Sequence, residues 1–304
     1  MDMYQKRKMR QEKKNNQQNN GLDKIQLNWY PGHMAKTKRN ISETISMVDI
    51  VIELVDSRIP FSSRIPDLAK ITRNKQNIIV FNKYDLCDPV ETNKWIEKYK
   101  SEGAIIVTCN SKTSNDYKKI INEVDTLMKD VNKKRMSKGL LPKKAKCLVV
   151  GVPNVGKSTL INKLAGRSIT GVGNKPGVTK QMNVIKINNQ MDLVDTPGIL
   201  WPKFETAMVA NNLASMTIIK EEVLTVEDIA VHILTMLSKY YPNILKKEFG
   251  IENYNNDEVE ECFEKISKFK NIPVKTEVDY ERVSLVIINS IKQEKIKGIT
   301  FDRI

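Results

Sequence analysis

The sequence predicts an α/β protein with a doubly wound, mostly parallel sheet flanked by helices, followed by a smaller all-α region. Two observations lead to this prediction. Up to about residue 200, short apolar runs rich in β-branched residues alternate with helical patterns, which is typical of parallel sheets covered by helices. Beyond residue 201 every pattern is helical. The length of 304 residues is enough for two domains with cores of their own.

The apolar runs have few polar interruptions, so we expect them to be strands buried in the sheet. A glycine-rich stretch at residues 168–180 is expected to be mobile until something orders it, and a basic stretch at 129–146 to be a connector. We expect strands at residues 49–55, 77–81, 104–108, 147–150, 182–187 and 191–194, and helices at 35–47, 91–100, 114–135, 205–219, 226–240, 257–269 and 278–295, with a further helix after the loop at 151–159.

The chain is strongly basic, and the excess lies in its first two thirds. The formal net charge is +14, and residues 1–200 carry 36 Lys and Arg against 19 Asp and Glu. This excess favours a polyanionic partner, nucleic acid before an acidic membrane surface, although lysines that only aid solubility also explain it. The stretch at 129–146 has eight basic residues and one acidic residue, and a solvated linker and an RNA contact are equally good interpretations of it.

The cysteines and the apolar content favour a soluble protein of a reducing compartment. Cys87, Cys109, Cys147 and Cys262 stand far apart without a C-x-x-C pair, so neither a zinc knuckle nor a disulfide framework is predicted. No apolar run approaches the roughly 18 residues that span a bilayer, and the charged N-terminal stretch lacks the apolar core of a signal peptide. We therefore expect a cytoplasmic protein without a membrane partner.

The stretch GVPNVGKST at residues 151–159 follows an apolar strand and matches the pattern G-x-x-x-x-G-K-[ST]. In this pattern the glycines let backbone N–H groups curl around phosphate oxygens, and the start of the following helix adds the positive end of its dipole. Lys157 is predicted to reach the outer phosphates, and the Ser158 hydroxyl to ligate Mg²⁺. A phosphate loop alone does not choose between ATP and GTP.

The tetrapeptide NKYD at residues 82–85 favours guanine. The Asp85 carboxylate can accept hydrogen bonds from both the ring N–H and the exocyclic amine of guanine, whereas adenine has no matching pair of donors. Asn82 is expected to tie this loop to the phosphate loop, and Lys83 to support the plane of the base. Together with the phosphate loop, the tetrapeptide predicts a GTP site.

Further positions complete the predicted site. Asp195 of DTPG is expected to hold Mg²⁺ through water, and the Gly198 N–H to reach the γ-phosphate. Thr179 of PGVT is the expected switch threonine on Mg²⁺ and the γ-phosphate, with Thr170 as the alternative. Because Asp195 lies directly before the helical region, we hypothesise that hydrolysis repositions that region.

These motifs, in this order, resemble the circularly permuted GTPases of the YlqF/RbgA family. The motifs are NKYD, NSK, GVPNVGKS, PGVT and DTPG, preceded by WYPGHMAK and VDSRIPFSSR, and they extend over about residues 28–204. The base-reading motifs precede the phosphate loop, whereas in most GTPases the phosphate loop comes first. The resemblance implies a circularly permuted Ras-like P-loop GTPase domain at residues 25–203 and a small all-α C-terminal domain at 204–304. The basic, Asn- and Gln-rich composition of residues 1–20 predicts a disordered N-terminal extension, which we place at 1–24.

The resemblance also implies a function. Members of this family are cytoplasmic GTPases of the late assembly of the large (50S) ribosomal subunit, which bind ribosomal RNA and are stimulated by the particle. The implied partners are the large-subunit precursor and its RNA, with a monomer away from the ribosome, and the implied cofactors are GTP or GDP, Mg²⁺ and K⁺. An RNA-binding scaffold that holds GTP as a structural ligand stays open as the alternative, because Ile199 stands where Ras-like GTPases have a water-positioning glutamine.

Some roles come only from the resemblance. His33 of PGHM, otherwise a polar loop residue, would act in hydrolysis or in structural docking. Asn154 would help to bind K⁺, and the backbone after Asn110 would read the guanine oxygen. His232, in an apolar helical pattern, is expected only to pack. The predicted GTP-binding residues are Asn82, Lys83, Tyr84, Asp85, Asn110, Ser111, Asn154, Val155, Gly156, Lys157, Ser158, Thr159, Thr179 and Gly198, and the predicted metal ligands are Ser158, Thr179 and Asp195 for Mg²⁺ and Asn154 for K⁺.

Overall fold

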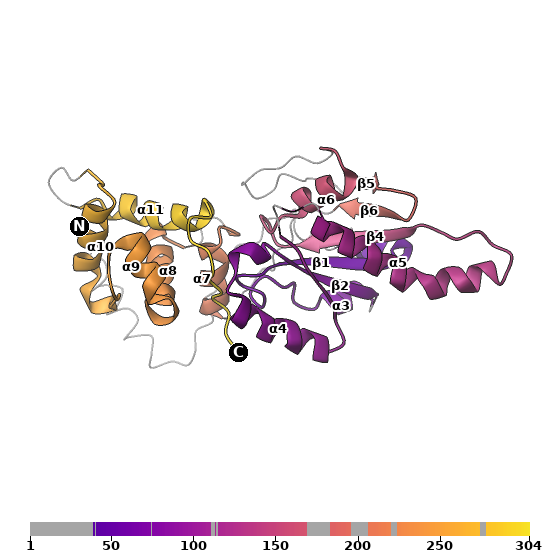
Figure 1. Ribbon diagram of the computed structural model, residues 1–304, viewed down its shortest axis with the longest axis horizontal. Coiled ribbons are helices and arrows are strands. Elements are labelled where there is room, and N and C mark those ends of the chain that lie inside the picture. The colour runs from indigo at the N-terminus through magenta and orange to yellow at the C-terminus, as the bar shows by residue number, and fades with distance from the viewer. Residues whose placement is uncertain are drawn as a thin grey trace.

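Two parts that lie side by side make up the computed structural model (Figure 1). The α/β part, up to residue 195, contains the sheet, and the helical part, from residue 206, is built from helices and turns. The predicted fold class is confirmed. The structure describes residues 39, 41–73, 75–110, 113, 115–168, 183–195, 206–219, 224–273 and 278–304.

The described strands form one sheet in the order β3-β2-β1-β4-β6-β5. Neighbouring strands are parallel except β5 and β6, which are antiparallel. The chain winds outward from β1 to β2 and β3 and then crosses back to place β4 on the other side of β1. In open α/β sheets ligands bind at the carboxyl ends of the strands where the order reverses, here between β1 and β4. The strands are β1 Ile50–Asp56, β2 Gln76–Asn82, β3 Ile105–Thr108, β4 Ala145–Gly151, β5 Asn183–Lys186 and β6 Met191–Asp195.

Both faces of the central strands are buried, as their nearly continuous apolar sequences predict. Ile50, Ile52 and Leu54 of β1 belong to the largest apolar cluster, whereas Val51 belongs to a second cluster with Leu148 of β4. Successive side chains of a strand point to opposite faces, so β1 contributes to the core on both sides. The helical elements of this part are η1 Ile45–Met47, α3 Leu68–Ile71, η2 Tyr84–Leu86, α4 Pro89–Ser101, α5 Asn115–Met136 and α6 Lys157–Ala165.

Helix α8 is central to the helical part, where it contacts α7, α9 and α11. Its first turn is capped by Thr225, whose Oγ1 accepts a hydrogen bond from the Asp228 N–H at 3.2 Å. Ile229, Ile233 and Leu237 lie on its buried side. The helical elements are α7 Ala207–Ser215, α8 Val226–Tyr240, α9 Pro242–Phe249, η3 Asn256–Glu258, α10 Val259–Phe269 and α11 Tyr280–Lys292.

The observed elements differ from the prediction mainly in the helical part. Helix α9 is absent from the prediction, although Pro242 at its first position and the left-handed Gly250 after its end (φ 71°) are typical helix boundaries. The helix predicted at 205–219 is shorter, because Thr206 caps its start and the left-handed Thr217 (φ 57°) follows its end. The predicted domain boundaries at 24/25 and 203/204 lie outside the described residues.

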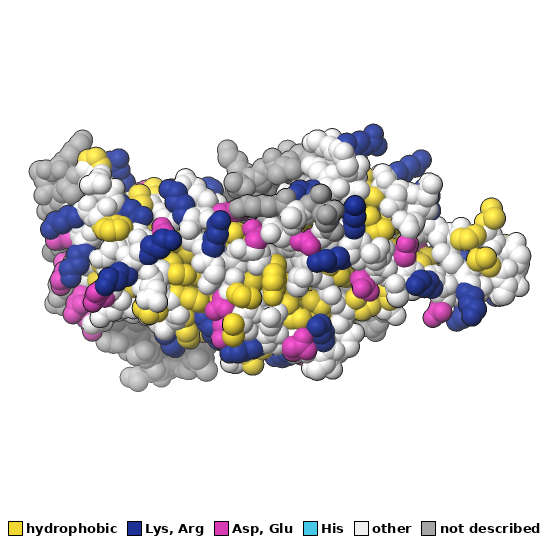
Figure 2. Space-filling model, in the orientation of Figure 1, with side chains coloured by type: hydrophobic (Ala, Val, Ile, Leu, Met, Phe, Trp, Pro, Cys, Tyr) yellow, Lys and Arg dark blue, Asp and Glu magenta, His cyan; other side chains and the backbone are white. Residues whose placement is uncertain are grey.

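One apolar cluster runs through both parts of the molecule. It includes Ile52 of the sheet and Leu160 of α6. It continues to Leu213 of α7, Ile233 of α8 and Phe301 in the segment after α11. The four cysteines are buried free thiols. Lys and Arg side chains are spread over both parts of the surface, with acidic side chains among them (Figure 2). Among the described helices, none combines the length and the apolar composition that crossing a bilayer requires.

Candidate nucleotide site

The two main motifs meet at one edge of the sheet. The parallel strands β1, β2 and β4 end at Asp56, Asn82 and Gly151, and their carboxyl ends lie at the same edge. NKYD continues from β2, and the phosphate loop continues from β4. The reversed order of the motifs along the sequence therefore does not separate them in space.

The phosphate loop needs glycine at two positions. Gly156 has φ +105°, and a Cβ there would overlap with Nδ2 of Asn82. A Cβ on Gly151 would lie 2.8 Å from the Leu54 carbonyl oxygen of β1. Lys157 is buried, and its Nζ donates hydrogen bonds to the carbonyls of Gly151 and Val152, both at 2.9 Å. The lysine is thus held within the loop, at the start of α6, where the helix dipole favours an anion.

Asn82 and Asp85 place NKYD against this loop. Asn82 Nδ2 donates to the Val155 carbonyl at 2.8 Å, which is the contact expected between the two loops. Asn82 Oδ1 and Asp85 Oδ1 are buried and have no hydrogen-bond partner among the residues that the structure describes. A buried acceptor without a partner costs about 1–3 kcal/mol, so a ligand that brings N–H donors would relieve this cost. Guanine has two such donors side by side, which fits Asp85.

Asp56, at the end of β1, is buried between two cations. Arg58 donates from Nε and Nη2 to the carboxylate at 2.9 and 2.7 Å, and Lys83 Nζ donates to Oδ2 at 3.0 Å. Burial alone would raise the pKa of Asp56, but the charges of Arg58 and Lys83 outweigh it and hold the pKa well below its usual range. Lys83 Nζ also donates to the Asn154 carbonyl at 3.1 Å. Asp56 therefore holds the lysine of NKYD against the phosphate loop.

Asp56 and Arg58 are not among the predicted site residues. A signal for them exists, because a carboxylate ends an otherwise apolar strand and an arginine follows two residues later. A buried carboxylate needs a cationic or hydrogen-bonding partner, and an arginine so close in the chain can supply one.

The loop after β3 also lies beside NKYD. The Tyr84 N–H donates to the Cys109 carbonyl at 3.1 Å, which places Asn110 next to the tetrapeptide. The Asn110 N–H in turn donates to Asp116 Oδ2 at 3.2 Å. The Tyr84 hydroxyl turns to α4, where it donates to Asn93 Oδ1 at 2.9 Å. Three loops at the carboxyl edge are thus joined by hydrogen bonds.

Comparisons with known proteins agree with this geometry. A family profile described as "50S ribosome-binding GTPase" matches residues 146–276, and one described as "RsgA GTPase" matches residues 35–205. "Ribosome biogenesis GTPase A" of Bacillus cereus is 39% identical over 277 residues, which cover 91% of this chain and 93% of that protein. The chain belongs to the ribosome biogenesis GTPase A family. A family member from Thermotoga maritima is 30% identical over 280 residues, covering 91% of this chain and 94% of that protein.

Solved structures of this family have the same fold. The crystal structure of GNP-bound YlqF from T. maritima has a TM-score of 0.62 at 25% identity, and the match covers 88% of this chain and 98% of that chain. The GDP-bound structure has a TM-score of 0.61 at the same identity. The resemblance to the YlqF/RbgA family is confirmed, and the chain is a GTP hydrolase that binds guanine nucleotides.

Several predicted residues of the ribosome biogenesis GTPase A site lie outside the described residues. They are His33, Ser111, Thr179 with its alternative Thr170, and Gly198. The described residues therefore include NKYD and the phosphate loop. The switch threonine and the catalytic histidine stay predictions.

The described metal-ligand candidates lie near the phosphate loop. Ser158 is the second residue of α6, and Thr159 is the third. Asp195 is the last residue of β6, in register with Val149 of β4, so its backbone reaches the same edge of the sheet. Asn154 has a left-handed backbone (φ 57°), and its Nδ2 donates to the Thr217 carbonyl after α7 at 2.7 Å. The phosphate loop thus contacts the helical part directly.

The helical part also contacts the base-reading loop, through the segment at residues 298–302 that follows α11. The Gly298 N–H donates to the Leu86 carbonyl at 2.8 Å, one residue after Asp85. The Phe301 N–H donates to the Arg58 carbonyl at 2.7 Å. Residues 298–302 therefore hold the backbones of both loops that carry the charges of the site.

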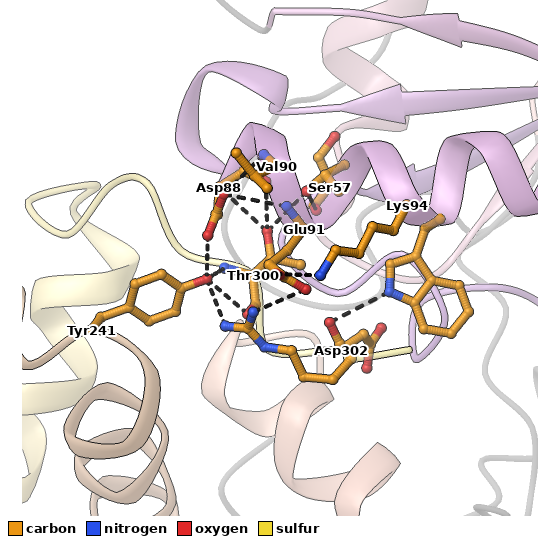
Figure 3. A network of polar contacts seen from close by, with 11 residues as sticks. Ser57, Asp88, Val90, Glu91, Lys94, Tyr241, Thr300 and Asp302 are labelled. Atoms are coloured by element: carbon orange, nitrogen blue, oxygen red, sulfur yellow. Dashed lines mark hydrogen bonds and ion pairs between the residues drawn. The ribbon is translucent and has the colours of Figure 1, made fainter.

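Polar side chains join the two parts beside this segment (Figure 3). The Tyr241 hydroxyl, between α8 and α9, donates to Asp88 Oδ2 at 3.0 Å and accepts from the Thr300 N–H at 2.9 Å. Asp88 caps the start of α4. Arg303 Nη2 donates to the same hydroxyl at 2.8 Å, and the hydroxyls of Thr92 and Thr300 are 2.8 Å apart.

Asp302 is the centre of a second buried cluster at this interface. Its carboxylate accepts from the N–H groups of Phe61 and Ser62, both at 2.7 Å, from Ser62 Oγ at 2.6 Å and from Asn212 Nδ2 at 2.8 Å. Burial raises the pKa of Asp302, and its neutral donors only partly offset this effect. Asn212 Oδ1 is 2.8 Å from His232 Nε2, which must donate because an amide oxygen only accepts. Burial lowers the pKa of His232 to about 4, so the ring is neutral at pH 7.

Proposed function

We propose that this GTPase acts in the late assembly of the large (50S) ribosomal subunit, binds the precursor particle and its RNA, and is stimulated by the particle. The profile that names the 50S ribosome and the names of the relatives support this partner. The basic excess of residues 1–200 supports an RNA contact. We place the chain in the cytoplasm, as a monomer when it is not on the ribosome.

One observation carries the proposed base specificity. Asp85 Oδ1 is a buried acceptor without a partner among the described residues, and its loop is tied to the phosphate loop by Asn82. We propose that the Asp85 carboxylate accepts hydrogen bonds from the ring N–H and the exocyclic amine of guanine. The Asp85→Asn variant tests this role, because its amide repels the guanine amine but can donate to the second carbonyl of xanthine. We expect GTP affinity to fall about 100-fold and XTP affinity to rise, measured by titration calorimetry. Equal GTP affinity of both proteins would remove the assignment.

The phosphate side is assigned in the same way. The backbone of residues 154–159 and Lys157 would bind the phosphates, and the Gly198 N–H would contact the γ-phosphate. Ser158, Thr179 and Asp195 would hold Mg²⁺, which supplies charge neutralisation for the phosphates when bound. Asn154 would help to bind K⁺. Hydrolysis at equal rates in K⁺ and Na⁺ buffers would argue against that role of Asn154.

His33 is proposed to act in particle-stimulated hydrolysis. Ile199 follows the DTPG glycine and cannot orient a water by hydrogen bonding, so another group must do so. We compare GTP hydrolysis by the native chain and by His33→Ala, each with and without purified large subunits. The variant should bind GTP normally but lose about 100-fold or more of the stimulated rate. An unchanged stimulated rate would leave His33 a structural role, and no stimulation of the native chain would contradict the proposed function itself.

The two-domain division, with a GTPase domain at residues 25–203 and a helical domain at 204–304, is part of the proposal. Hydrolysis would reposition the helical domain, because both the phosphate loop and the base loop contact it. The Asn154–Thr217 hydrogen bond at 2.7 Å and the Gly298–Leu86 hydrogen bond at 2.8 Å support such a coupling. Solution scattering of the chain with GDP and with a non-hydrolysable GTP analogue tests it, and identical profiles would count against it.

A further inference from the structure

The end of α5 and the chain that follows it stand away from the body of the molecule. We call residues 129–144 the α5–β4 arm. Met128 before it and Ala145 after it are buried, but no residue between them is. A helix rises about 1.5 Å per residue, so the helical portion from Met128 to Met136 extends about 12 Å beyond the last buried side chain. Figure 1 shows α5 and the following loop projecting from the α/β part, on the side away from the helical part.

The arm is held together by its own hydrogen bonds, unlike a loose linker. The Gly139 N–H donates to the Met136 carbonyl at 2.9 Å, in a left-handed turn (φ 70°) that ends the helix. Arg135 Nε donates to the Leu141 carbonyl at 3.0 Å. Asn132 accepts from the Lys143 N–H at 3.0 Å and donates to its carbonyl at 3.3 Å, which fastens the returning chain to the helix.

This ordered turn presents apolar side chains to water. Leu141 is 83% exposed, Met136 61% and Leu140 49%, and Val131 on the helix is 40% exposed. At the same end of the molecule, Figure 2 shows yellow side chains with dark blue ones nearby and magenta next to the dark blue. Isolated exposed apolar residues are common, but four on one small, hydrogen-bonded projection indicate a contact surface.

The lysines at residues 129–138 of the arm lack acidic partners among the described residues. Lys129, Lys133, Lys134 and Lys138 form no ion pair with any acidic side chain of the described residues. The arm and its base, residues 129–146, contain eight basic residues and one acidic residue. Lys143 at the base pairs with Asp49. The remaining charge is therefore uncompensated within the described structure and faces outward.

Other surface helices hold some of their lysines in ion pairs. In α4, Lys94 pairs with Glu91 at 2.7 Å and Lys100 with Glu97 at 2.9 Å. In α10, Lys265 pairs with Glu261 at 2.7 Å. Among the described residues, no lysine at positions 129–138 has such compensation.

We propose that the α5–β4 arm is a docking element for structured RNA, with its lysines on phosphates and its apolar tip against exposed bases or sugars. The inference rests on the proposed function, in which large-subunit RNA is the ligand. Uncompensated lysines on a narrow projection fit a polyanion, whose counterions they release. Four apolar side chains are too few for the core of a stable protein interface, but a small apolar wedge suits an RNA groove or an unstacked base.

The experiment measures binding of a fluorescently labelled stem-loop of large-subunit RNA at several salt concentrations. The test variants are the triple change Lys133→Ala, Lys134→Ala and Lys138→Ala and the double change Leu140→Ser and Leu141→Ser. The matched control removes three lysines from α4, with Lys94→Ala, Lys98→Ala and Lys100→Ala. All of these side chains lie outside the nucleotide site, so basal GTP hydrolysis should be unchanged and reports correct folding.

We expect the arm lysine variant to raise the Kd about 10-fold or more and to reduce the slope of log K against log salt by about 2–3. The leucine variant should raise the Kd about threefold and keep the slope, because it removes no charge. The control should bind as the native chain does. Native-like RNA binding by both arm variants would overturn the proposal. It would also be overturned if the arm variants kept their RNA binding but lost binding to a ribosomal protein free of RNA, because the arm would then contact protein.

The proposed function has a separate readout. If large subunits stimulate native GTP hydrolysis but the arm variants bind RNA normally, only the arm proposal fails. If the native chain neither binds the RNA nor responds to large subunits, both the arm proposal and the proposed function fail.

Discussion

Asp56, at the end of β1, and Asp302, in the segment that follows α11, are both buried aspartates, yet their surroundings differ in one respect. Asp56, at the nucleotide edge, is held by the cations of Arg58 and Lys83. Asp302, at the interface with the helical part, is held only by neutral N–H and O–H donors. The pKa of Asp56 lies well below its usual range, and the pKa of Asp302 lies above it.

Because both carboxylates are buried, the opposite directions of their pKa shifts come from the charge of their partners. The cationic partners hold the pKa of Asp56 well below its usual range, so its charge can hold Lys83 in place. Neutral donors satisfy the oxygens of Asp302 but do not compensate its charge. Moderate acid should therefore leave Asp56 charged, whereas Asp302, with a raised pKa, and His232, with a lowered one, lie at the interface.

The largest effect should come from Asp56→Asn, which leaves the buried cations of Arg58 and Lys83 without a countercharge. We expect the free energy of unfolding to fall by about 3–5 kcal/mol and GTP affinity to fall with it. Denaturant unfolding and nucleotide titration measure both. The control is Asp67→Asn, because its ion pair with Lys70 is exposed and should contribute at most about 1 kcal/mol. An equal fall in the free energy of unfolding in both variants would contradict the special role of the buried cations around Asp56.

A smaller loss should follow Asp302→Ala, which leaves the N–H donors of Phe61 and Ser62 and the amide of Asn212 without their acceptor. We expect the free energy of unfolding to fall by about 2–4 kcal/mol. GTP affinity should change less than in Asp56→Asn, because no charge of the nucleotide edge is removed. If Asp302→Ala lowered GTP affinity more than Asp56→Asn does, the interface would support the nucleotide site more strongly than the cations around Asp56 do.

The pH dependence should come from the interface as well. The pKa of His232 falls from 6.5 to about 4 on folding, so the unfolded chain binds more protons between these values. The free energy of unfolding therefore decreases as the pH falls from 6.5 to 4, by about 1–3 kcal/mol. Asp302, whose pKa is raised, opposes this loss at the acid end of the window. Unfolding of native and His232→Gln proteins at pH 7 and pH 4.5 tests this, and an equal decrease in both would exclude His232 as the cause.

The smallest effect should come from Tyr241→Phe at the rim of the interface. The change removes the hydroxyl that bonds Asp88, Thr300 and Arg303, and these groups keep other partners or access to water. We expect the free energy of unfolding, measured by thermal unfolding, to fall by about 1 kcal/mol. Tyr84→Phe is the matched control, since its hydroxyl bonds Asn93 at an exposed position and should contribute less. A larger loss in the control would contradict the expected difference.

Much of the fold follows from local sequence. The strands β1, β2 and β4 are apolar runs that end in Asp56, Asn82 and Gly151. The motif of the phosphate loop predicts the turn from β4 to α6. Helix α9 is missing from the prediction because eight residues between a proline and a glycine give too short a pattern. The order β3-β2-β1-β4-β6-β5 has no local signal, since it depends on which strands pair.

The site was predictable where a motif carries it. NKYD and GVPNVGKST identify the loops, and the structure joins them through Asn82 and Val155. The supports of these loops could not be predicted. Asp302 contacts Ser62 across 240 residues of sequence, and no periodicity or spacing relates two positions so far apart.

The contacts of residues 298–302 also bear on how the protein is made. A nascent chain folds from its N-terminal side as it leaves the ribosome, so the sheet, NKYD and the phosphate loop are synthesised well before Gly298. Leu86 and Arg58 cannot form their hydrogen bonds with Gly298 and Phe301 until this late segment emerges. Translation that stops before residue 298 would yield a chain with both nucleotide motifs but without the last backbone support of the base loop. The base loop thus gains this backbone support only after Gly298 has been synthesised.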